Sequence, residues 1–132
     1  MGIDIHVYME YRSRKKKRYM CHGRLESPRL YGLFETMCNV FSYVEPLYKA
    51  KGLPGDVTPQ VLIKYKEFGG SAHYASWLTT EEFRECLDLA DQRYSKSDSE
   101  GWLQEYELIY SYLLDSENNG EPARIVFWFD YS

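Results

Sequence analysis

The amino-terminal residues alternate between apolar and polar side chains. The apolar positions are Ile3, Ile5, Val7, Met9 and Tyr11, and the positions between and after them are Asp4, His6, Tyr8, Glu10 and Arg12. A period of two over ten residues predicts a β-strand with one apolar face. The run 12–18 is strongly charged and reads as a hairpin turn, which leads to a second short strand from Tyr19 to His22.

The carboxyl-terminal segment Arg124 to Tyr131 predicts another strand. Its core of branched and aromatic residues, Ile125 to Phe129, is apolar at consecutive positions. A strand that is apolar on both faces is typical of the middle of a sheet. We therefore place it centrally and expect the two terminal strands to be neighbours.

Between the terminal strands, apolar residues recur at helical spacing. Helix starts are indicated by Ser27-Pro28, by Thr58-Pro59 and by a capping box in which Thr79 is the N-cap and Glu82 the third helical residue. A fourth helix is predicted from Trp102 to Leu114, after a solvated stretch from Tyr94 to Gly101. The prediction is one domain, residues 1–132, of the α+β class: a small sheet from the amino-terminal hairpin and the carboxyl-terminal strand, packed against about four helices.

Composition narrows the classes of protein. Hydrophobic residues make up 44% of the chain and aromatic residues 17%, which indicates a folded core. The net charge of −4 argues against nucleic acid as the main partner. No apolar run approaches the roughly 20 residues of a membrane span. With an acid at position four and no cleavable apolar stretch, the amino-terminal residues are not expected to act as a signal peptide. The expected location is the cytoplasm, with Cys21, Cys38 and Cys86 as reduced thiols.

Asp4 and His6 are the first candidates for chemistry. Side chains two apart on a strand share a face, at roughly 6 to 7 Å along the chain. A carboxylate beside an imidazole orients a base, holds an imidazolium or supplies two metal ligands. The alternative is a partly buried histidine that hydrogen-bonds to Asp4 and has no role in chemistry. Glu10 shares the face but lies roughly 20 Å farther along, outside the same shell of ligands.

The segment from Gly69 to Leu78 is the second candidate, read as a loop. Its glycines and small residues let a ligand approach the backbone closely. His73, Ser76 and Trp77 precede the capped helix, whose amino terminus favours an anion. The alternative is an ordinary glycine loop with a packed tryptophan and a surface histidine.

The basic run at 12–18 carries six positive charges in seven residues. It suits a clamp on phosphates or on an acidic partner. It equally suits a solvated hairpin tip that discourages edge pairing, and we favour the tip because no aromatic residues are interleaved with the charges.

Several motifs together resemble a family of small uncharacterised proteins found in bacteriophages, prophages and bacterial genomes. They are the opening Met1-Gly2-Ile3-Asp4-Ile5-His6 with Glu10, the segments Arg29 to Phe34, Gly52 to Val57 and His73 to Thr79, and the ending Val126 to Asp130. The resemblance implies no activity. It implies that Asp4, His6, Arg29, Tyr31, His73, Ser76 and Trp77 belong to recurrent polar motifs. Leu30 and Tyr74 depart from the family pattern, where Asn and Ser are usual.

Three functions remain open from the sequence. The first is a pocket for a small anionic, nucleotide-like ligand, with Arg29 holding the anion, Tyr31 and Trp77 stacking, and Asp4, His6 and His73 setting orientation. The second is a hydrolase of phosphoesters that uses a divalent metal on Asp4, His6 and His73, with Asp130 as a further ligand. The third is a protein interaction module that docks through exposed aromatic residues. The same polar residues serve the first two, so the sequence leaves open whether the protein is an enzyme.

Overall fold

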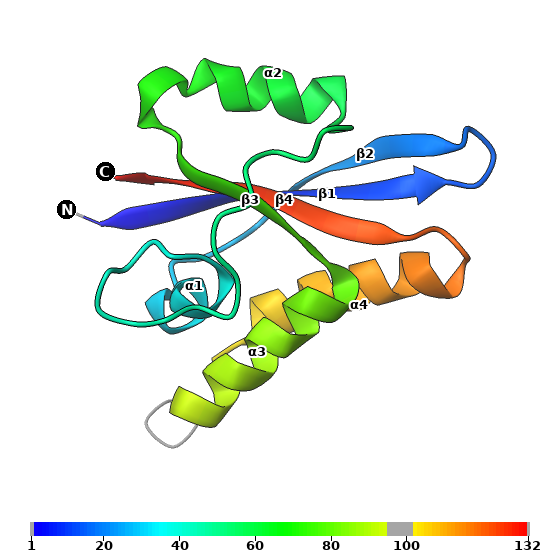
Figure 1. The fold of residues 1–132 in the computed structure, drawn as a ribbon. Coiled ribbons are helices and arrows are strands. Elements are labelled where there is room, and N and C mark those ends of the chain that lie inside the picture. Colours follow the sequence, from blue (N-terminus) through cyan, green and yellow to red (C-terminus); the bar gives the residue numbers. More distant parts are fainter. Residues whose placement is uncertain (1, 95–101, 132) are drawn as a thin grey trace.

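The computed structural model describes residues 2–94 and 102–131 and has helices on both faces of a four-stranded antiparallel sheet (Figure 1). The strand order is β2-β1-β4-β3. The α+β prediction is confirmed. The strands are β1 (Ile3–Ser13), β2 (Arg18–Leu25), β3 (His73–Thr79) and β4 (Ala123–Tyr131), and the helices are α1 (Tyr31–Met37), α2 (Pro59–Glu67), α3 (Thr80–Tyr94) and α4 (Gln104–Asn118), with a 3-10 turn at Gly69–Ser71.

The two terminal strands are neighbours, as predicted. β1 and β4 pair antiparallel from Ile3 opposite Tyr131 to Tyr11 opposite Ala123. β4 lies between β1 and β3, which confirms its central position. Its residues from Ala123 to Phe129 are all buried, because helices cover both sides of the strand. Figure 1 shows the chain ends together at one end of the sheet and the β1–β2 turn at the other.

Two apolar clusters hold the helices to the sheet. Helices α1, α3 and α4 pack on what we call the three-helix face, around the side chains of Ile5, Val7, Met9, Ile125, Phe127 and Phe129. Helix α2 packs on the opposite side, the α2 face, where Tyr8, Val61, Val126 and Trp128 form a smaller cluster. The alternate face of β1 is therefore largely covered. Tyr8 is only 8% exposed and Glu10 is fully buried.

The predicted capping box is present at the start of α3. The Thr79 hydroxyl accepts the Glu82 backbone N–H at 3.1 Å, and the Glu82 carboxylate accepts the Thr79 backbone N–H at 3.0 Å. The two bonds satisfy donors that the first turn of a helix leaves without partners. They fix the point at which the chain leaves β3 and enters α3.

Helix boundaries differ from the prediction at both α1 and α4. Helix α1 begins at Tyr31 rather than at Ser27-Pro28, and it ends at Met37, where Cys38 takes an extended conformation. Phe41 lies beyond the helix and packs against the core. Helix α4 continues to Asn118. The solvated stretch predicted after Tyr94 falls mostly on 95–101, outside the described residues.

The largest correction concerns the segment 69–78. It was expected to be a loop, but only Gly69–Ser71 is a turn, and His73–Thr79 is the edge strand β3. The pairing of β3 with β4 slips by one residue between His73 and Ser76, which is a β-bulge. A bulge interrupts the alternation of apolar and polar residues, so the sequence of this strand lacks the period of two that revealed β1.

Helices α3 and α4, the longest of those described, have 15 residues each. Within residues 2–94 and 102–131, no helix has both the length and the apolar character that a bilayer span requires.

Candidate functional site

Five of the seven predicted site residues lie on strands, and the structure divides these five between the two faces of the sheet. Residues opposite one another on neighbouring strands point to the same side. Asp4 and His6 lie opposite Asp130 and Trp128, on the α2 face. His73 and Ser76 lie opposite Phe129 and Phe127, on the three-helix face, whereas Trp77 lies opposite Val126 on the α2 face.

The β-bulge explains why His73 is separated from Trp77. Residues four apart in a regular strand share a face, but the extra residue between His73 and Ser76 reverses the order. Tyr74, inside the bulge, has a backbone φ of +55°. His73 and Trp77, which were expected to line one pocket, therefore lie on opposite faces of the sheet.

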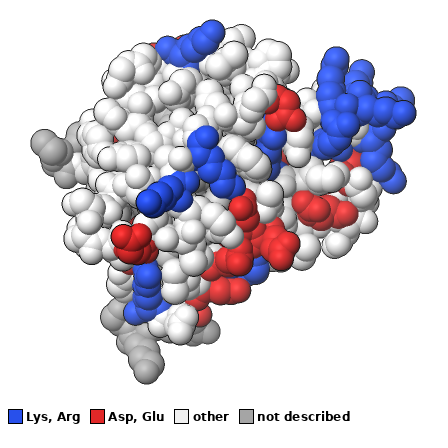
Figure 2. All heavy atoms as spheres, in the orientation of Figure 1, with Lys and Arg blue, Asp and Glu red and all other residues white. Residues whose placement is uncertain are grey.

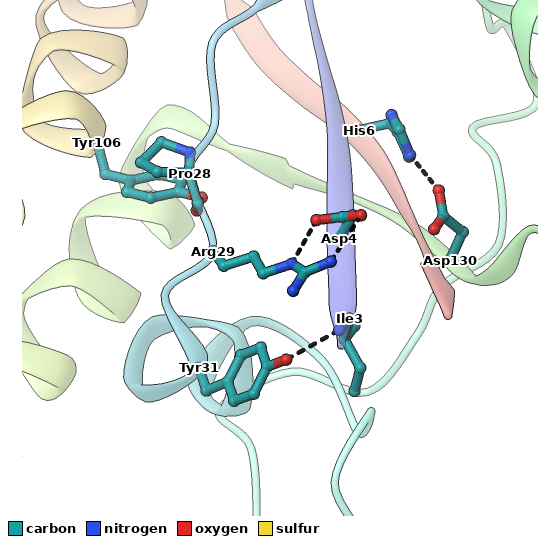
Figure 3. Close-up of polar contacts among 8 residues, drawn as sticks. All are labelled: Ile3, Asp4, His6, Pro28, Arg29, Tyr31, Tyr106 and Asp130. Carbon is teal, nitrogen blue, oxygen red and sulfur yellow. Dashed lines mark hydrogen bonds and ion pairs between the residues drawn. The ribbon is translucent and has the colours of Figure 1, made fainter. Parts of the chain in front are cut away.

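Arg29 and Asp4 form a bidentate ion pair at the start of β1 (Figure 3). Arg29 Nε and Nη2 donate to the two Asp4 carboxylate oxygens at 2.6 and 3.1 Å. The hydrogen bond with Asp4 raises the pKa of Arg29. A side chain at position 2 would begin 2.2 Å from Arg29 Nη1, so the guanidinium would have to shift to make room for it. Both side chains are more than a third exposed, so water weakens their attraction.

Tyr31 holds the same end of β1 through a backbone contact. Its phenol oxygen accepts the backbone N–H of Ile3 at 2.8 Å, and its side chain stays substantially exposed (Figure 3). Arg29 lies just before α1 and Tyr31 is the first residue of the helix, so together they attach the start of α1 to the first strand. Both residues were expected to share a site with Asp4, and their contacts bring them to the same end of β1.

His6 binds the carboxyl-terminal strand rather than a shared pocket. Its Nε2 pairs with Oδ2 of Asp130, and both side chains are 18% exposed. Asp4 and Asp130 are directly opposite one another, an arrangement that is unfavourable for like charges. Arg29 and His6 each engage one of the two carboxylates, so Asp4, His6, Arg29 and Asp130 form a polar cluster that satisfies its own charges (Figure 3).

His73 does not join this cluster. Its ring packs against that of Tyr131, with centroids 4.7 Å apart, on the three-helix face. Among residues 2–94 and 102–131, no three His, Cys, Asp or Glu side chains are grouped so that they could hold a metal ion. The predicted ligand trio of Asp4, His6 and His73 is not assembled, because the sheet itself separates His73 from the other two.

Ser76 and Trp77 contact the segment that packs along the outer edge of β3. Ser76 is buried, and its hydroxyl accepts the Lys51 backbone N–H at 3.0 Å. Gly52, which follows Lys51, donates its backbone N–H to the Ala75 carbonyl at 2.8 Å. The Lys51 ammonium lies 4.1 Å from the centroid of the Trp77 indole. These contacts attach the segment at 51–52 to the edge strand, which accounts for both residues without a ligand.

A buried ion pair on the α2 face was not predicted. Arg124 donates to the Glu10 carboxylate at 2.8 Å from Nε and to Asp56 at 2.8 Å from Nη1. Glu10 also accepts the Thr58 backbone N–H at 2.8 Å, at the start of α2. The guanidinium lies 3.6 Å from the centroid of the Tyr19 ring. Glu10 makes no contact with the cluster around Asp4, as expected. Its carboxylate instead joins Arg124 on β4 to the start of α2 and so anchors that helix to the sheet. The signal for it was an arginine at the head of an apolar central strand.

A group of aromatic side chains at the surface includes the predicted residues Tyr31 and His73 and four others that were not predicted. Tyr74 and Tyr131 are 38% and 47% exposed. Burial first, and then the neighbouring Tyr74, raise the pKa of Tyr131. Ile3 links this pair to a second group, because it lies opposite Tyr131 and binds Tyr31. We call the whole set the terminal aromatic surface: Tyr31, Phe41, Tyr43, His73, Tyr74 and Tyr131.

Of the seven predicted residues, Tyr31 lines a surface cavity of about 300 Å³. The cavity also touches Tyr43, Tyr94 and Trp102. Its lining is largely aromatic but includes the Glu35 side chain, and Tyr31 and Tyr43 connect it with the terminal aromatic surface.

Comparisons of the chain with protein-family models, with curated proteins and with solved structures found no match. The resemblance to phage and prophage proteins therefore rests on the sequence motifs alone.

Proposed function

We propose that this protein is an interaction module that docks a partner protein through the terminal aromatic surface. The observation that carries the proposal is Tyr74, a bulky residue with a backbone φ of +55° and an exposed ring. For a non-glycine residue this left-handed conformation costs roughly 1–2 kcal/mol. Bulges re-aim side chains, and strained conformations gather at functional positions.

The composition of the surface supports docking of a protein. Tyrosine is enriched among the residues that dominate binding energy at protein interfaces, because it combines a large apolar ring with a polar tip. Tyr43 is 74% exposed and Tyr31 is 40% exposed, beside the partly exposed Tyr74 and Tyr131. Large aromatic side chains that remain this open in the folded chain favour a partner that covers them.

The polar cluster supplies a rim for this surface. Arg29 and Asp4 are held in one geometry by their two hydrogen bonds, at the same end of the sheet as Tyr31. A partially exposed polar rim around an aromatic centre is the usual arrangement at such interfaces. Because these side chains are already ordered, binding would cost little further conformational entropy.

The partner is a protein of a bacterial cell if the resemblance to phage and prophage proteins reflects the origin of the chain. The proposal is tested by affinity capture from a bacterial lysate with three immobilised proteins. They are the wild type, the double variant Tyr74→Ala/Tyr131→Ala and a control, Leu47→Ala/Ile63→Ala, which removes two exposed apolar side chains elsewhere.

The expected result is a protein retained by the wild type and the control but not by the tyrosine variant. With that protein purified, calorimetry should show about a 100-fold or greater loss of affinity in the tyrosine variant. If every captured protein binds the wild type and the tyrosine variant equally, the proposal is wrong.

A small anionic, nucleotide-like ligand is the second candidate, favoured by the Asp4-held guanidinium of Arg29 beside the Tyr31 ring. A panel of nucleotides should then raise the Tm of the wild type, and Arg29→Gln should abolish the rise. The same outcome would count against docking as the primary function. The metal-dependent hydrolase is not proposed, because its ligands lie on opposite faces of the sheet.

A further inference from the structure

The β1–β2 hairpin tip is a concentrated positive charge. Arg12, Arg14, Lys15, Lys16, Lys17 and Arg18 are all exposed, and among the described residues none of their side chains forms an ion pair. Figure 2 shows these cations gathered at one end of the molecule. The chain as a whole has a net charge of −4, so the residues outside this tip carry −10.

The opposite charge collects on α3 and α4. Together with the turn that follows α4, these helices carry ten acidic residues against two arginines. Figure 2 shows acidic side chains over α3 and α4, beside the basic tip. The outer face of α4 also exposes Leu108, Tyr112 and Leu114, with exposed fractions of 52%, 42% and 39%. An acidic surface with exposed apolar side chains fits a basic partner whose side chains have long apolar stems.

The acidic and apolar side chains of α4 line a groove against β2, an edge strand of the sheet. One cavity of about 270 Å³ lies between His22 on β2 and Tyr112 and Asp115 on α4. A second, of about 220 Å³, continues between Arg24 and Glu26 on one side and Glu105 and Leu108 on the other. Tyr112 lines both.

The basic tip lies at one end of this groove. The Arg14 backbone N–H donates to the Glu121 carboxylate at 3.0 Å, just after the carboxyl terminus of α4. The opposite end of the groove holds Glu105 and Leu108, near the amino terminus of the helix. With 15 residues, α4 separates its two ends by about 22 Å. One continuous surface therefore runs from strongly positive to acidic and apolar.

We infer that this β2–α4 surface joins two copies of the chain in a two-fold symmetric dimer. A surface with a positive end and a negative end is complementary to itself when a copy is turned by half a rotation about its centre. The tip of each copy then covers Glu105 and Leu108 of the other, and the axis passes near Tyr112. The basic partner that the groove requires is thus present on the chain itself. This site is separate from the terminal aromatic surface, so neither proposal depends on the other.

The experiment measures the molar mass of the full chain by sedimentation at low and high salt. The wild type should be dimeric at low salt, with a dissociation constant that rises by about tenfold or more between roughly 50 and 300 mM salt, as screening weakens exposed charge pairs. Two charge-reversed variants complete the design. The tip variant is Lys15→Glu/Lys16→Glu/Lys17→Glu, and the groove variant is Glu26→Lys/Glu105→Lys, which reverses two exposed carboxylates at the end of the groove that the partner's tip covers.

Each reversed variant should be monomeric alone, because both contacts of its dimer become repulsive. Mixed in equal amounts they should form a heterodimer, since both contacts are then attractive. A control, Lys49→Glu/Lys64→Glu/Lys66→Glu, has the same net charge as the tip variant but alters exposed lysines elsewhere and should remain dimeric. A wild type that is monomeric at low salt, or reversed variants that do not associate when mixed, would overturn the inference.

Discussion

Replacing Arg124 with alanine is expected to lower the free energy of unfolding by about 3–5 kcal/mol. The Arg124 and Glu10 side chains are 5% and 0% exposed, so the substitution leaves a buried carboxylate without its cation. The contacts of Arg124 with Asp56 and with the Tyr19 ring are lost as well. Urea unfolding followed by tryptophan fluorescence measures the change.

A double substitution separates the charge from the packing. In Glu10→Leu/Arg124→Met both charges leave together, and stability should recover most of the loss, because apolar residues of similar volume often replace a buried ion pair without cost. The matched control is Lys64→Ala, which breaks the exposed pair with Glu67 and should change stability by about 0.5 kcal/mol or less. Equal losses in Arg124→Ala and Lys64→Ala would show that the buried pair does not anchor α2.

Trp128→Ala is expected to cost about 3–5 kcal/mol, the range for truncation of a large buried aromatic residue. The Trp128 side chain is fully buried and is the centre of the cluster beneath α2. Its ring stacks on Tyr8 at 5.4 Å and meets the edges of Tyr65 and Phe68 at 5.3 and 5.6 Å.

The loss of stability in Trp128→Ala should be greatest in α2, the helix that packs on Trp128. Hydrogen exchange at the backbone amides of α2 should accelerate more than exchange in α3, because α3 packs on the other face of the sheet. Trp128→Phe, which retains most of the ring, should show a much smaller effect. Uniform acceleration in α2 and α3 would mean that the two faces do not have separate clusters.

Much of the fold follows from local patterns in the sequence. The alternation in β1, the apolar run of β4 and the Thr79 capping box are each set by a few neighbouring residues, and each is present as predicted. β3 was missed because its bulge destroys the alternation, and α2 covers a face of β1 that its polar residues made appear solvated.

The site was less accessible from the sequence, for a geometric reason. Asp4, Arg29 and Tyr31 were predicted to lie together and do, because a short segment crosses the start of β1. The side of the sheet on which His73 lies depends on the register of β3 with β4, and one additional residue reverses it. Register between distant strands is set by packing, so spacing alone does not reveal it.

We propose that the backbone at Tyr74 adopts a less stable conformation because this conformation directs the aromatic ring toward a partner. The most direct test compares the free energies of unfolding of Tyr74→Gly and Tyr74→Ala, which lose the same ring. In a regular strand alanine is the more stable of the two. At a φ of +55° glycine should instead be more stable by about 1 kcal/mol. An alanine variant as stable as the glycine variant, or more stable, would contradict the account.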